Sequence, residues 1–506
     1  MSGHASAEGI SLRELFAGIE FRAGSEVPDI SVTDISANSG LVEAGGLFLA
    51  CRGFSRHGLE FLDEALDVGV GAVAWEPEEG FAEPQLPAGV AGLCVPQLGD
   101  RVGIIADRFF GTPSAELAVT GITGTNGKTT TAWLVTNALL GTGVQAGYMG
   151  TLGFGIGQNL ESSALTTPGC IAVHRRLRKL ADFGATAVAM EVSSHGLDQG
   201  RIDGVKLRTA AFTNLSRDHL DYHGSLEAYK AAKARLFEVA GLETAVINIG
   251  DPFGAELVGK QPKPLKVISV ALAEASVDGH QACLIAELLD TDADGMRIGF
   301  SGEFGSAEMH SPLWGTFNVE NLLVAVGILL ASDYDLQAAA QALENCQAPP
   351  GRMQVVRGPA ASPLVVVDFA HTPDAMVKAL GALREHCKGK VGVVFGCGGN
   401  RDEGKRAEMG AAAATHADRV IVTDDNPRDE HPADISAAVV AGVTGATPVE
   451  VVHDRAAAIQ RAIEAASADD AVLIAGKGAE NFQLVAGRRK PFCDAAVAAE
   501  VLGVAA

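Results

Sequence analysis

Short apolar runs separated by glycine and proline turns recur along most of the chain. In the N-terminal part, the runs Gly46–Ala50 and Gly71–Trp75 lie between such turns, which predicts a small α/β unit. The pattern then changes to an apolar run (Leu117–Ile122), a glycine-rich loop and a stretch long enough for a helix (Lys128–Leu140). This order of strand, loop and helix is typical of the first unit of a parallel α/β sheet.

A second series of apolar runs fills the C-terminal part of the chain. The runs alternate with alanine-rich helical stretches and are Leu364–Val367, Val391–Phe395, Arg419–Thr423 and Ala471–Ala475. Polar residues follow the ends of these runs, where open parallel sheets bind their ligands. The pattern therefore predicts a second parallel sheet with a binding site at its carboxyl edge.

Two turns indicate where the chain divides into domains. One is Gly111-Thr112-Pro113-Ser114, and the other is Pro349-Pro350-Gly351, which follows the helical stretch Leu336–Asn345. At 506 residues the chain exceeds the size at which a single core stops growing. We predict an α/β fold of three domains: a small N-terminal α/β domain (1–111), a central domain with a P-loop-type parallel sheet (112–347), and a C-terminal Rossmann-like domain (348–506).

Composition and charge narrow the classes of partner. A net charge of -23 disfavours sequence-independent binding to nucleic acid or to an anionic membrane, although a local basic pocket stays possible. The longest apolar stretch, Leu322–Ala331, is far shorter than a membrane span, and the N-terminus lacks the pattern of a secretory signal. The cysteines form no CxxC pair, which favours reduced thiols. We expect a soluble, cytoplasmic protein without membrane insertion.

The glycine-rich loop after the first strand of the central domain is a candidate phosphate site. Its backbone N–H groups could surround phosphate oxygens, the Lys128 ammonium could contact the terminal phosphates, and the Thr129 hydroxyl could bind Mg²⁺. A strict P-loop pattern would have glycine where Ile122 stands, and an ordinary glycine-rich turn is the alternative. The strand, loop and helix context favours ATP binding by Gly124, Thr125, Asn126, Gly127, Lys128, Thr129 and Thr130.

Several later segments, together with the spelling GTNGKTT, resemble the Mur ligases, the amide-forming enzymes of bacterial peptidoglycan precursor synthesis. The matching segments occur in the family's order and are Thr166-Thr167-Pro168-Gly169, Glu191 to His195, Gln199-Gly200-Arg201, Asn214 to Gly224, Tyr229 to Lys233, Phe317 to Asn321, Gly351-Arg352 and Asp368 to Asp374. Such a series from about residue 38 to residue 480 is not expected by chance.

The segment Asp425-Asn426-Pro427-Arg428 resembles the motif of the family members that add meso-2,6-diaminopimelate rather than lysine. The resemblance implies an ATP-dependent, ADP-forming amide ligase. It would join diaminopimelate to the D-glutamate γ-carboxylate of UDP-N-acetylmuramoyl-L-alanyl-D-glutamate through an acyl phosphate. Physically, Arg428 could pair with the second carboxylate of diaminopimelate, whereas lysine would place an ammonium beside it. A turn with one solvated arginine is the alternative.

The resemblance also implies roles at the catalytic centre. Lys128 would contact the β- and γ-phosphates, Thr129 and Glu191 would hold Mg²⁺, and His219 would bind a second metal ion. Lys233 matches a position that is carbamylated in the family, a modification that requires a neutral amine and so a lowered lysine pKa. Without the flanking motifs, a helix-start carboxylate, a buried histidine and a solvated lysine would be the simpler interpretations.

Substrate contacts follow from the resemblance in the same way. Asn318, Arg352 and Asp368 match contacts to the base, phosphate and ribose of ATP, and closure of the C-terminal domain over the nucleotide would exclude water. The UDP-muramoyl dipeptide would contact Ser39, Thr166, Thr167, Ser193, Gln199 and Arg201. Diaminopimelate would contact Arg401, Asp425, Asn426, Pro427, Arg428, Gly476 and Glu480.

Two departures from the family pattern and several rivals qualify this assignment. The family's Asp-Ser-Arg reads Asn38-Ser39-Gly40, and its Gly-Lys-Gly-His-Glu reads Gly476 to Glu480 with Ala479 in place of histidine. The rivals are a lysine-adding member, a folylpolyglutamate synthetase and a non-catalytic ATP-binding regulatory protein. Family habit implies a monomer.

Overall fold

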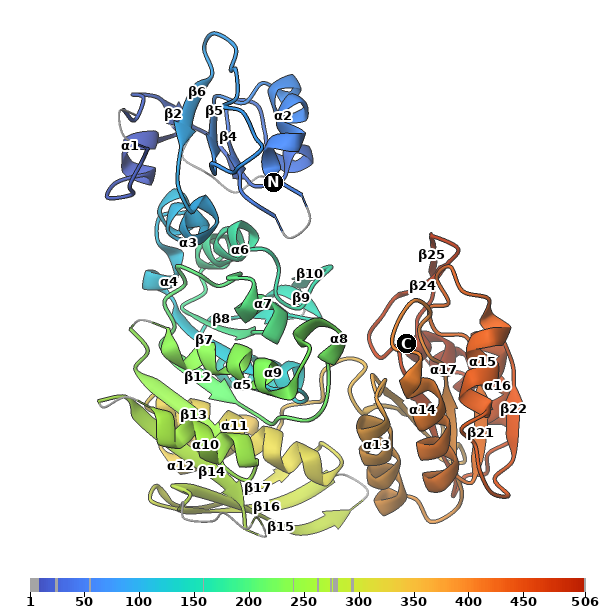
Figure 1. The fold of residues 1–506 in the computed structure, drawn as a ribbon. Helices are drawn as coiled ribbons and strands as arrows, with labels where there is room; N and C mark the ends of the chain where they lie inside the picture. Colours follow the sequence, from blue (N-terminus) through green and yellow to red (C-terminus); the bar gives the residue numbers. More distant parts are fainter. Residues whose placement is uncertain are drawn as a thin grey trace.

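The computed structural model describes residues 9–22, 26–53, 56–157, 159–239, 241–261, 264–273, 275, 281–292 and 295–504. Within them, helices and strands alternate around three main sheets that follow one another along the chain (Figure 1). The expected α/β class is therefore confirmed. Among the described residues no helix is long and apolar enough to cross a membrane.

The N-terminal domain is built on a four-stranded parallel sheet with the order β3-β4-β5-β6. All four residues of β4 and of β5 are buried, as expected for parallel strands covered on both faces. Its elements are β1 (Ile10–Ser11), α1 (Leu12–Leu15), β2 (Ser31–Val32), β3 (Ile35–Ser36), β4 (Leu47–Ala50), α2 (Leu62–Val68), β5 (Ala72–Trp75), β6 (Ala91–Cys94) and α3 (Leu98–Phe109).

A close approach of backbones joins this domain to the central one. A Cβ on Gly103, in α3, would lie 2.4 Å from the Asp203 carbonyl oxygen, so only glycine fits there. Next to it, the His174 ring contacts the same carbonyl through Nε2 at 2.9 Å, and Arg175 donates to the Asp34 carboxylate at 2.9 Å. The α3 helix thus lies directly on the central domain (Figure 1).

The central domain contains an eleven-stranded mixed sheet with the order β10-β9-β8-β11-β7-β12-β13-β14-β15-β16-β17. The strands from β8 to β15 are parallel, and antiparallel strands extend the sheet at both edges. Its elements are α4 (Pro113–Glu116), β7 (Ala118–Thr123), α5 (Lys128–Gly141), β8 (Ala146–Gly150), β9 (Gly153–Ile156), β10 (Asn159–Glu161), α6 (Cys170–Asp182), β11 (Ala187–Glu191), α7 (Ser194–Asp198), β12 (Thr209–Phe212), α8 (Leu220–His223), α9 (Leu226–Ala234), β13 (Thr244–Asn248), α10 (Pro252–Lys260), β14 (Lys266–Leu272), β15 (Leu284–Asp292), β16 (Gly295–Gly302), β17 (Gly305–Ser311), α11 (Thr316–Ala331) and α12 (Leu336–Leu343).

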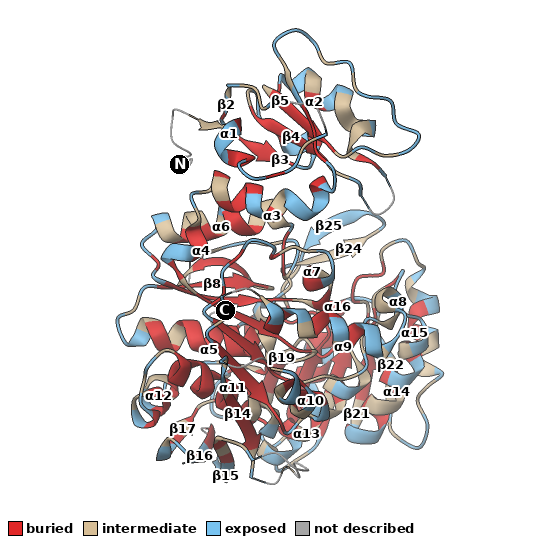
Figure 2. Cartoon of the chain, turned by 60° about the vertical axis from the view of Figure 1, so that its left-hand side comes forward, coloured by how far each residue is buried: buried red, intermediate tan, exposed pale blue. Residues whose placement is uncertain are grey.

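Two hydrophobic cores cover the two faces of this sheet. One joins α5, α11 and α12 to the sheet, and the other joins α6 and α10 to its opposite face. The α11 helix is apolar nearly all round and is buried accordingly (Figure 2). The strands are therefore held rigidly, and the loops at their carboxyl ends start from fixed positions.

The C-terminal domain has a six-stranded sheet with the order β18-β19-β23-β20-β21-β22, parallel except for the edge strand β18. Its elements are β18 (Gln354–Val356), β19 (Leu364–Asp368), α13 (Pro373–His386), β20 (Val391–Phe395), α14 (Gly404–His416), β21 (Arg419–Val422), α15 (Pro432–Val440), β22 (Val449–Val451), α16 (Arg455–Glu464), β23 (Ala471–Ala475), the hairpin of β24 (Phe482–Val485) with β25 (Arg488–Pro491), and α17 (Asp494–Leu502).

The apolar runs identified in the sequence form the buried strands with ends that shift by a residue at most. Three features differ from the expectation of parallel sheets. The central sheet ends in the antiparallel strands β9 and β10 at one edge and in the antiparallel meander β15–β17 at the other, and the C-terminal sheet begins with the antiparallel strand β18. All three lie towards the edges of the sheets, outside the parallel strands.

Candidate active site

The glycine-rich loop between β7 and α5 is shaped by contacts that exclude a side chain. A Cβ on Gly124 would lie 1.9 Å from Thr213 Oγ1, and one on Gly127, whose φ is +84°, would lie 2.2 Å from Asn321 Oδ1. Asn126 accepts a hydrogen bond from Thr213 Oγ1 at 2.6 Å through its carbonyl oxygen. The loop is therefore fixed against the end of β12.

Two lysines meet at this loop. Lys128 donates through Nζ to the carbonyl oxygens of Gly124 and Thr125, both at 2.8 Å, and Lys233 donates to the same Gly124 oxygen at 2.8 Å. Burial lowers the pKa of both ammonium groups. The Lys233 pKa lies well below its ordinary value because that side chain is buried and the Lys128 charge repels it. The lowered pKa raises the fraction of neutral Lys233 amine, the form that carbamylation would require.

Glu191, at the end of β11, is a buried carboxylate surrounded by donors. Oε2 accepts from the Thr129 hydroxyl at 2.8 Å and the Thr151 hydroxyl at 3.1 Å, while Oε1 accepts from the Tyr148 hydroxyl and from the Thr151 N–H. The oxygens of Thr129 and Glu191 form a donor set that suits a hard divalent cation. Among the described residues no group of three or more His, Cys, Asp or Glu side chains could hold a metal ion, so further ligands would come from substrate oxygens, water or a modified lysine.

His219 lies at the start of α8 and belongs to a cluster of aromatic rings. Its ring centroid is 4.8 Å from that of His195, which is 4.2 Å from Tyr222 and 5.4 Å from His223. His219 Nε2 contacts the Asp218 carboxylate at 3.4 Å, and burial lowers the pKa of the histidine. Within the described residues it makes no hydrogen bond to the oxygens of Thr129 or Glu191, so the predicted second metal ligand is separate from the first pair.

The residues expected to contact the muramoyl dipeptide form a connected rim in the central domain. Thr167 donates to the carbonyl oxygen of Glu191 at 3.0 Å and accepts from the Ser193 N–H at 3.0 Å. Arg201 donates to the Thr167 carbonyl oxygen at 2.7 Å and to the Gln199 side chain. Their hydrogen bonds tie this rim to the strand that carries the buried carboxylate.

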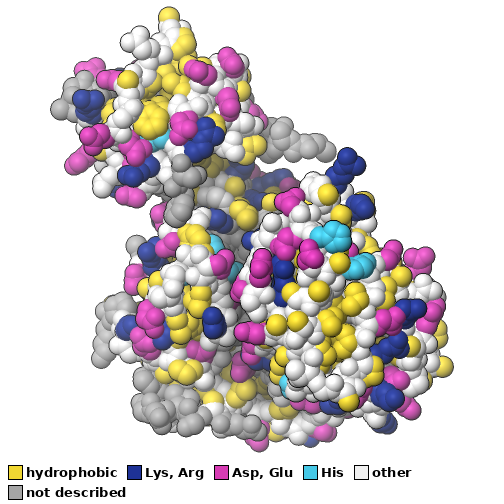
Figure 3. Space-filling model, turned by 45° about the vertical axis from the view of Figure 1, so that its right-hand side comes forward, with side chains coloured by type: hydrophobic (Ala, Val, Ile, Leu, Met, Phe, Trp, Pro, Cys, Tyr) yellow, Lys and Arg dark blue, Asp and Glu magenta, His cyan; other side chains and the backbone are white. Residues whose placement is uncertain are grey.

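Of the two other predicted substrate residues, one adjoins the rim and one lies in the N-terminal domain. Thr166 joins the rim through a hydroxyl contact of 3.0 Å with Thr151. Ser39 lies in the N-terminal domain, is 6% exposed, and donates to the Glu64 carboxylate at 2.8 Å. Figure 3 shows that the molecular surface is hollowed between the N-terminal domain and the other two, and basic side chains appear at the edge of the hollow.

The residues predicted to contact ATP make hydrogen bonds or ring contacts with neighbouring residues of the chain. Asn318 is buried. Its Nδ2 donates to the Trp314 carbonyl oxygen, and its Oδ1 accepts from Asn321 Nδ2. The Asp368 carboxylate accepts backbone N–H groups at 2.8 Å on each oxygen, and burial raises its pKa. The Arg352 guanidinium lies 4.1 Å from the centroid of the Phe369 ring.

Residues of the DNPR segment meet the end of β23 in the C-terminal domain. Arg428 has a φ of +54°, and its guanidinium donates to the Gly399 carbonyl oxygen at 2.6 Å. Burial and the charge of exposed Arg401 lower the Arg428 pKa. A Cβ on Gly476 would lie 2.7 Å from the buried Asp425 carboxylate, and Pro427 is packed against the Gly399 backbone.

Asn426, which was expected to contact the amino acid, also makes hydrogen bonds within the protein through both ends of its side chain. Its Nδ2 donates to Glu480 Oε2 at 2.9 Å, and its Oδ1 accepts from the Leu484 N–H and from Lys477. The hairpin is therefore anchored on this segment, with Arg428 N–H donating to Leu484 O and Ala486 N–H donating to Arg428 O. Sequence reasoning missed Lys477, whose only signal was its place between two glycines of the motif.

Family models match the central and C-terminal domains. Residues 122–329 match the Mur ligase middle domain, and residues 351–478 match the Mur ligase glutamate ligase domain. The chain is 46% identical over 477 residues, 94% of each chain, to the UDP-N-acetylmuramoyl-L-alanyl-D-glutamate–2,6-diaminopimelate ligase of Xanthomonas oryzae pv. oryzae. This chain belongs to the Mur ligase family.

Other members of the Mur ligase family agree with this assignment. A ligase of the same printed name from Chromobacterium violaceum is 44% identical over 479 residues, again 94% of each chain. A solved structure of a 2,6-diaminopimelate ligase is 36% identical with a TM-score of 0.70, covering 98% of this chain and 99% of that one. A folylpolyglutamate synthase of Mycobacterium tuberculosis shares only the fold, at 18% identity and a TM-score of 0.60, over 79% of this chain and 94% of that one.

Proposed function

We propose that this Mur ligase adds meso-2,6-diaminopimelate to the D-glutamate γ-carboxylate of UDP-N-acetylmuramoyl-L-alanyl-D-glutamate, with ATP and Mg²⁺. The carboxylate oxygen attacks the γ-phosphorus of ATP, and the bond to the bridging oxygen breaks to give an acyl phosphate and ADP. The amine of diaminopimelate then attacks the acyl carbon, loses a proton and displaces phosphate. The names of the relatives and the shared catalytic segments support this reaction.

The residues around the phosphate loop suit the first step. Lys128 would leave its two carbonyl partners and contact the β- and γ-phosphates. Glu191 and Thr129 would hold Mg²⁺, which when bound neutralises charge on the phosphates. A neutral Lys233 amine would react with CO₂ to form a carbamate, whose oxygens could reach the same region. The rim around Arg201 and Thr167 would hold the carboxylate end of the acceptor.

The observation that carries the choice of amino acid is the presence of two opposite charges on either side of the DNPR segment. The Arg428 guanidinium, within the segment, donates to the Gly399 carbonyl oxygen, and the Glu480 carboxylate, after β23, accepts from Asn426 of the segment. The far end of diaminopimelate carries a carboxylate and an ammonium, which match this pair. Lysine carries only the ammonium and would leave Arg428 without an anion.

A comparison of two amino acids as substrates tests the proposal. The enzyme, ATP, Mg²⁺ and the UDP-muramoyl dipeptide are incubated with diaminopimelate or with lysine, and the product mass is measured. We expect product with diaminopimelate only. Product from lysine alone would replace this function by the lysine-adding activity, and absence of substrate-dependent phosphate release would indicate a non-catalytic protein.

A matched pair of variants sharpens that test. Replacing Arg428 with Met should lower kcat/KM for diaminopimelate by roughly 100-fold, because loss of a hydrogen bond between the guanidinium and the distal carboxylate costs about 1.5–3 kcal/mol. Arg489→Met, on the exposed strand β25 of the adjoining hairpin, should change it by less than about twofold. Equal losses in the two variants would contradict a specific role for Arg428.

The remaining assignments are part of the same proposal. The N-terminal domain, bounded near residue 111, would bind the UDP end through Ser39. The central domain, to about residue 347, would bind ATP, and the C-terminal domain would bind the amino acid. We propose that the enzyme acts as a monomer in the cytoplasm. Equilibrium sedimentation with and without substrates would test the monomer.

A further inference from the structure

A fully buried lysine lies behind the proposed amino-acid site without an assigned role. Lys477 lies two residues after the end of β23 and has 0% exposure, yet it carries an ammonium group. Burying a charge is unfavourable unless it is paired and hydrogen-bonded. Its Nζ donates to Glu480 Oε2 at 2.7 Å and to Asn426 Oδ1 at 3.3 Å. The cost of burial is thus offset by two residues of the amino-acid site.

The hydrogen bonds around Lys477 restrain one carboxylate. Glu480 Oε2 accepts from Lys477 and, at 2.9 Å, from Asn426 Nδ2. Asn426 is itself oriented by the Leu484 N–H at 2.8 Å. No hydrogen bond within the described residues reaches Glu480 Oε1, and the Glu480 side chain is 32% exposed. One oxygen of the carboxylate is therefore fixed, and the other is left to accept from a ligand.

The sequence around Glu480 makes Lys477 more important in this chain. The family pattern has a histidine before the glutamate, but here Ala479 offers no polar side chain. Among the described residues, the side-chain donors to Glu480 are Lys477 and Asn426. Lys477 also favours the ionised form of buried Asp425, whose pKa is raised by burial. The charge of buried Arg455 acts on Asp425 in the same direction as that of Lys477.

We propose that Lys477 is a positioning residue that sets which amino acid the enzyme accepts. It orients Glu480 so that the free oxygen receives the distal ammonium of a diamino acid, while Arg428 receives the distal carboxylate. Recognition of both groups requires a fixed spacing between the carboxylate and the guanidinium. This inference rests on the proposed function, because it deepens the account of the same site.

Kinetics of Lys477→Met test the proposal, with diaminopimelate-dependent turnover by the wild type shown first. We expect KM for diaminopimelate to rise by roughly 10- to 100-fold, in line with loss of a charge-assisted hydrogen bond. KM for ATP and for the UDP-muramoyl dipeptide should stay within about threefold of wild type, since the Lys477 ammonium donates to Glu480 and Asn426 and, among the described residues, makes no hydrogen bond to a predicted contact of either substrate. Lys390→Met, an exposed lysine before β20, serves as the matched control and should behave as wild type.

A double-variant cycle distinguishes positioning from general support of the fold. If Lys477 acts through Glu480, adding Lys477→Met to Glu480→Gln should raise KM for diaminopimelate by less than about threefold further. The preference for diaminopimelate over 2-aminopimelate, which lacks the distal ammonium, should also shrink in Lys477→Met. Lys477→Gln is the second variant, with the same expected results.

Each outcome decides one question. If the wild type does not use diaminopimelate, the proposed function is wrong and the role of Lys477 falls with it. If the wild type uses it but Lys477→Met keeps the wild-type KM and preference, or if the effects of the two substitutions multiply, the positioning role is wrong. Failure of both Lys477 variants to fold while Lys390→Met folds would also overturn it, because Lys477 would then serve the fold.

Discussion

A buried ion pair beneath the amino-acid site allows a quantitative test of the C-terminal domain. Arg455 begins α16 and Asp494 begins α17, and both side chains have 0% exposure. Two hydrogen bonds join them, Nε to Oδ1 at 2.7 Å and Nη2 to Oδ2 at 2.8 Å. Nη2 also donates at 2.9 Å to the carbonyl oxygen of Ala475, the residue before Gly476. The pair therefore holds both helices and the strand end that carries the proposed site.

Replacing Arg455 with Met leaves the Asp494 carboxylate buried without its cation. Removing one partner of a buried pair costs about 3–5 kcal/mol. The N-terminus of α17 still stabilises the anion by about 1 kcal/mol, so we expect a net loss of about 2–4 kcal/mol. Replacing both partners, as Arg455→Met with Asp494→Leu, should recover most of this loss because no charge then remains buried.

The assay is unfolding in denaturant, followed by pulsed hydrogen exchange of peptides from α16 and α17 so that the C-terminal domain is measured by itself. Lys378→Met is the control, since Lys378 and Asp374 form a pair at 3.0 Å with both side chains 48% exposed. That change should cost less than about 0.5 kcal/mol. A loss below about 1 kcal/mol in Arg455→Met, or a double variant no more stable than the single one, would refute the reasoning.

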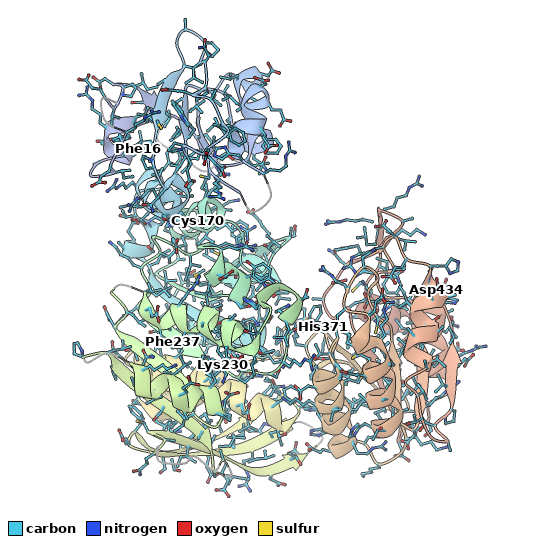
Figure 4. All side chains as sticks on the ribbon, viewed as in Figure 1. Phe16, Cys170, Lys230, Phe237, His371 and Asp434 are labelled. Carbon is cyan, nitrogen blue, oxygen red and sulfur yellow. The ribbon has the colours of Figure 1, made fainter. Side chains whose placement is uncertain are left out.

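Three further predictions concern Lys233 and Gly124 at the phosphate loop and His371 in the C-terminal domain. Lys233→Ala should nearly abolish substrate-dependent phosphate release, and added bicarbonate should not restore it; full activity would contradict the carbamate. Gly124→Ala, whose Cβ would lie 1.9 Å from Thr213, should lower kcat/KM for ATP by roughly 100-fold, whereas Gly141→Ala, with open space around it, should not. Burial lowers the pKa of His371, on the side facing the central domain (Figure 4), to about 4. The folded state then binds this proton more weakly than the unfolded chain. The contribution of neutral His371 to the free energy of unfolding is therefore complete above the ordinary histidine pKa and is lost as the pH falls towards about 4. We expect a loss of about 1–2 kcal/mol, measured by denaturant titration, and its absence in His371→Gln.

The strands were predictable because they are buried on both faces. Runs such as Val391–Phe395 and Ala471–Ala475 are apolar throughout, and no other element of that length matches the pattern. The meander β15–β17 was not predicted, because its strands expose many residues and carry no continuous apolar run. An exposed edge strand is specified by pairing with its neighbour, which a local pattern does not record.

The candidate site was predictable only where its residues lie close together in the sequence. The residue types of the glycine-rich loop suggested phosphates by themselves. The DNPR segment is also local, but it suggested a carboxylate only together with the resemblance to the Mur ligases. The shared contact of Lys128 and Lys233 with Gly124 joins segments more than a hundred residues apart. Likewise, nothing local indicates that Lys477 is buried or that Asn426 binds Lys477 and Glu480. Such facts depend on how the sheets bring distant loops together.

The hairpin that adjoins Arg428 has a consequence for engineering. Arg428 keeps a left-handed backbone conformation while its N–H and C=O are both paired with residues of the hairpin. Introducing the DNPR segment alone into a lysine-adding relative would add the guanidinium without the strand that fixes its backbone conformation. Exchange of substrate preference between ligases should therefore require that the segment and the hairpin travel as one cassette, although they are far apart in the gene.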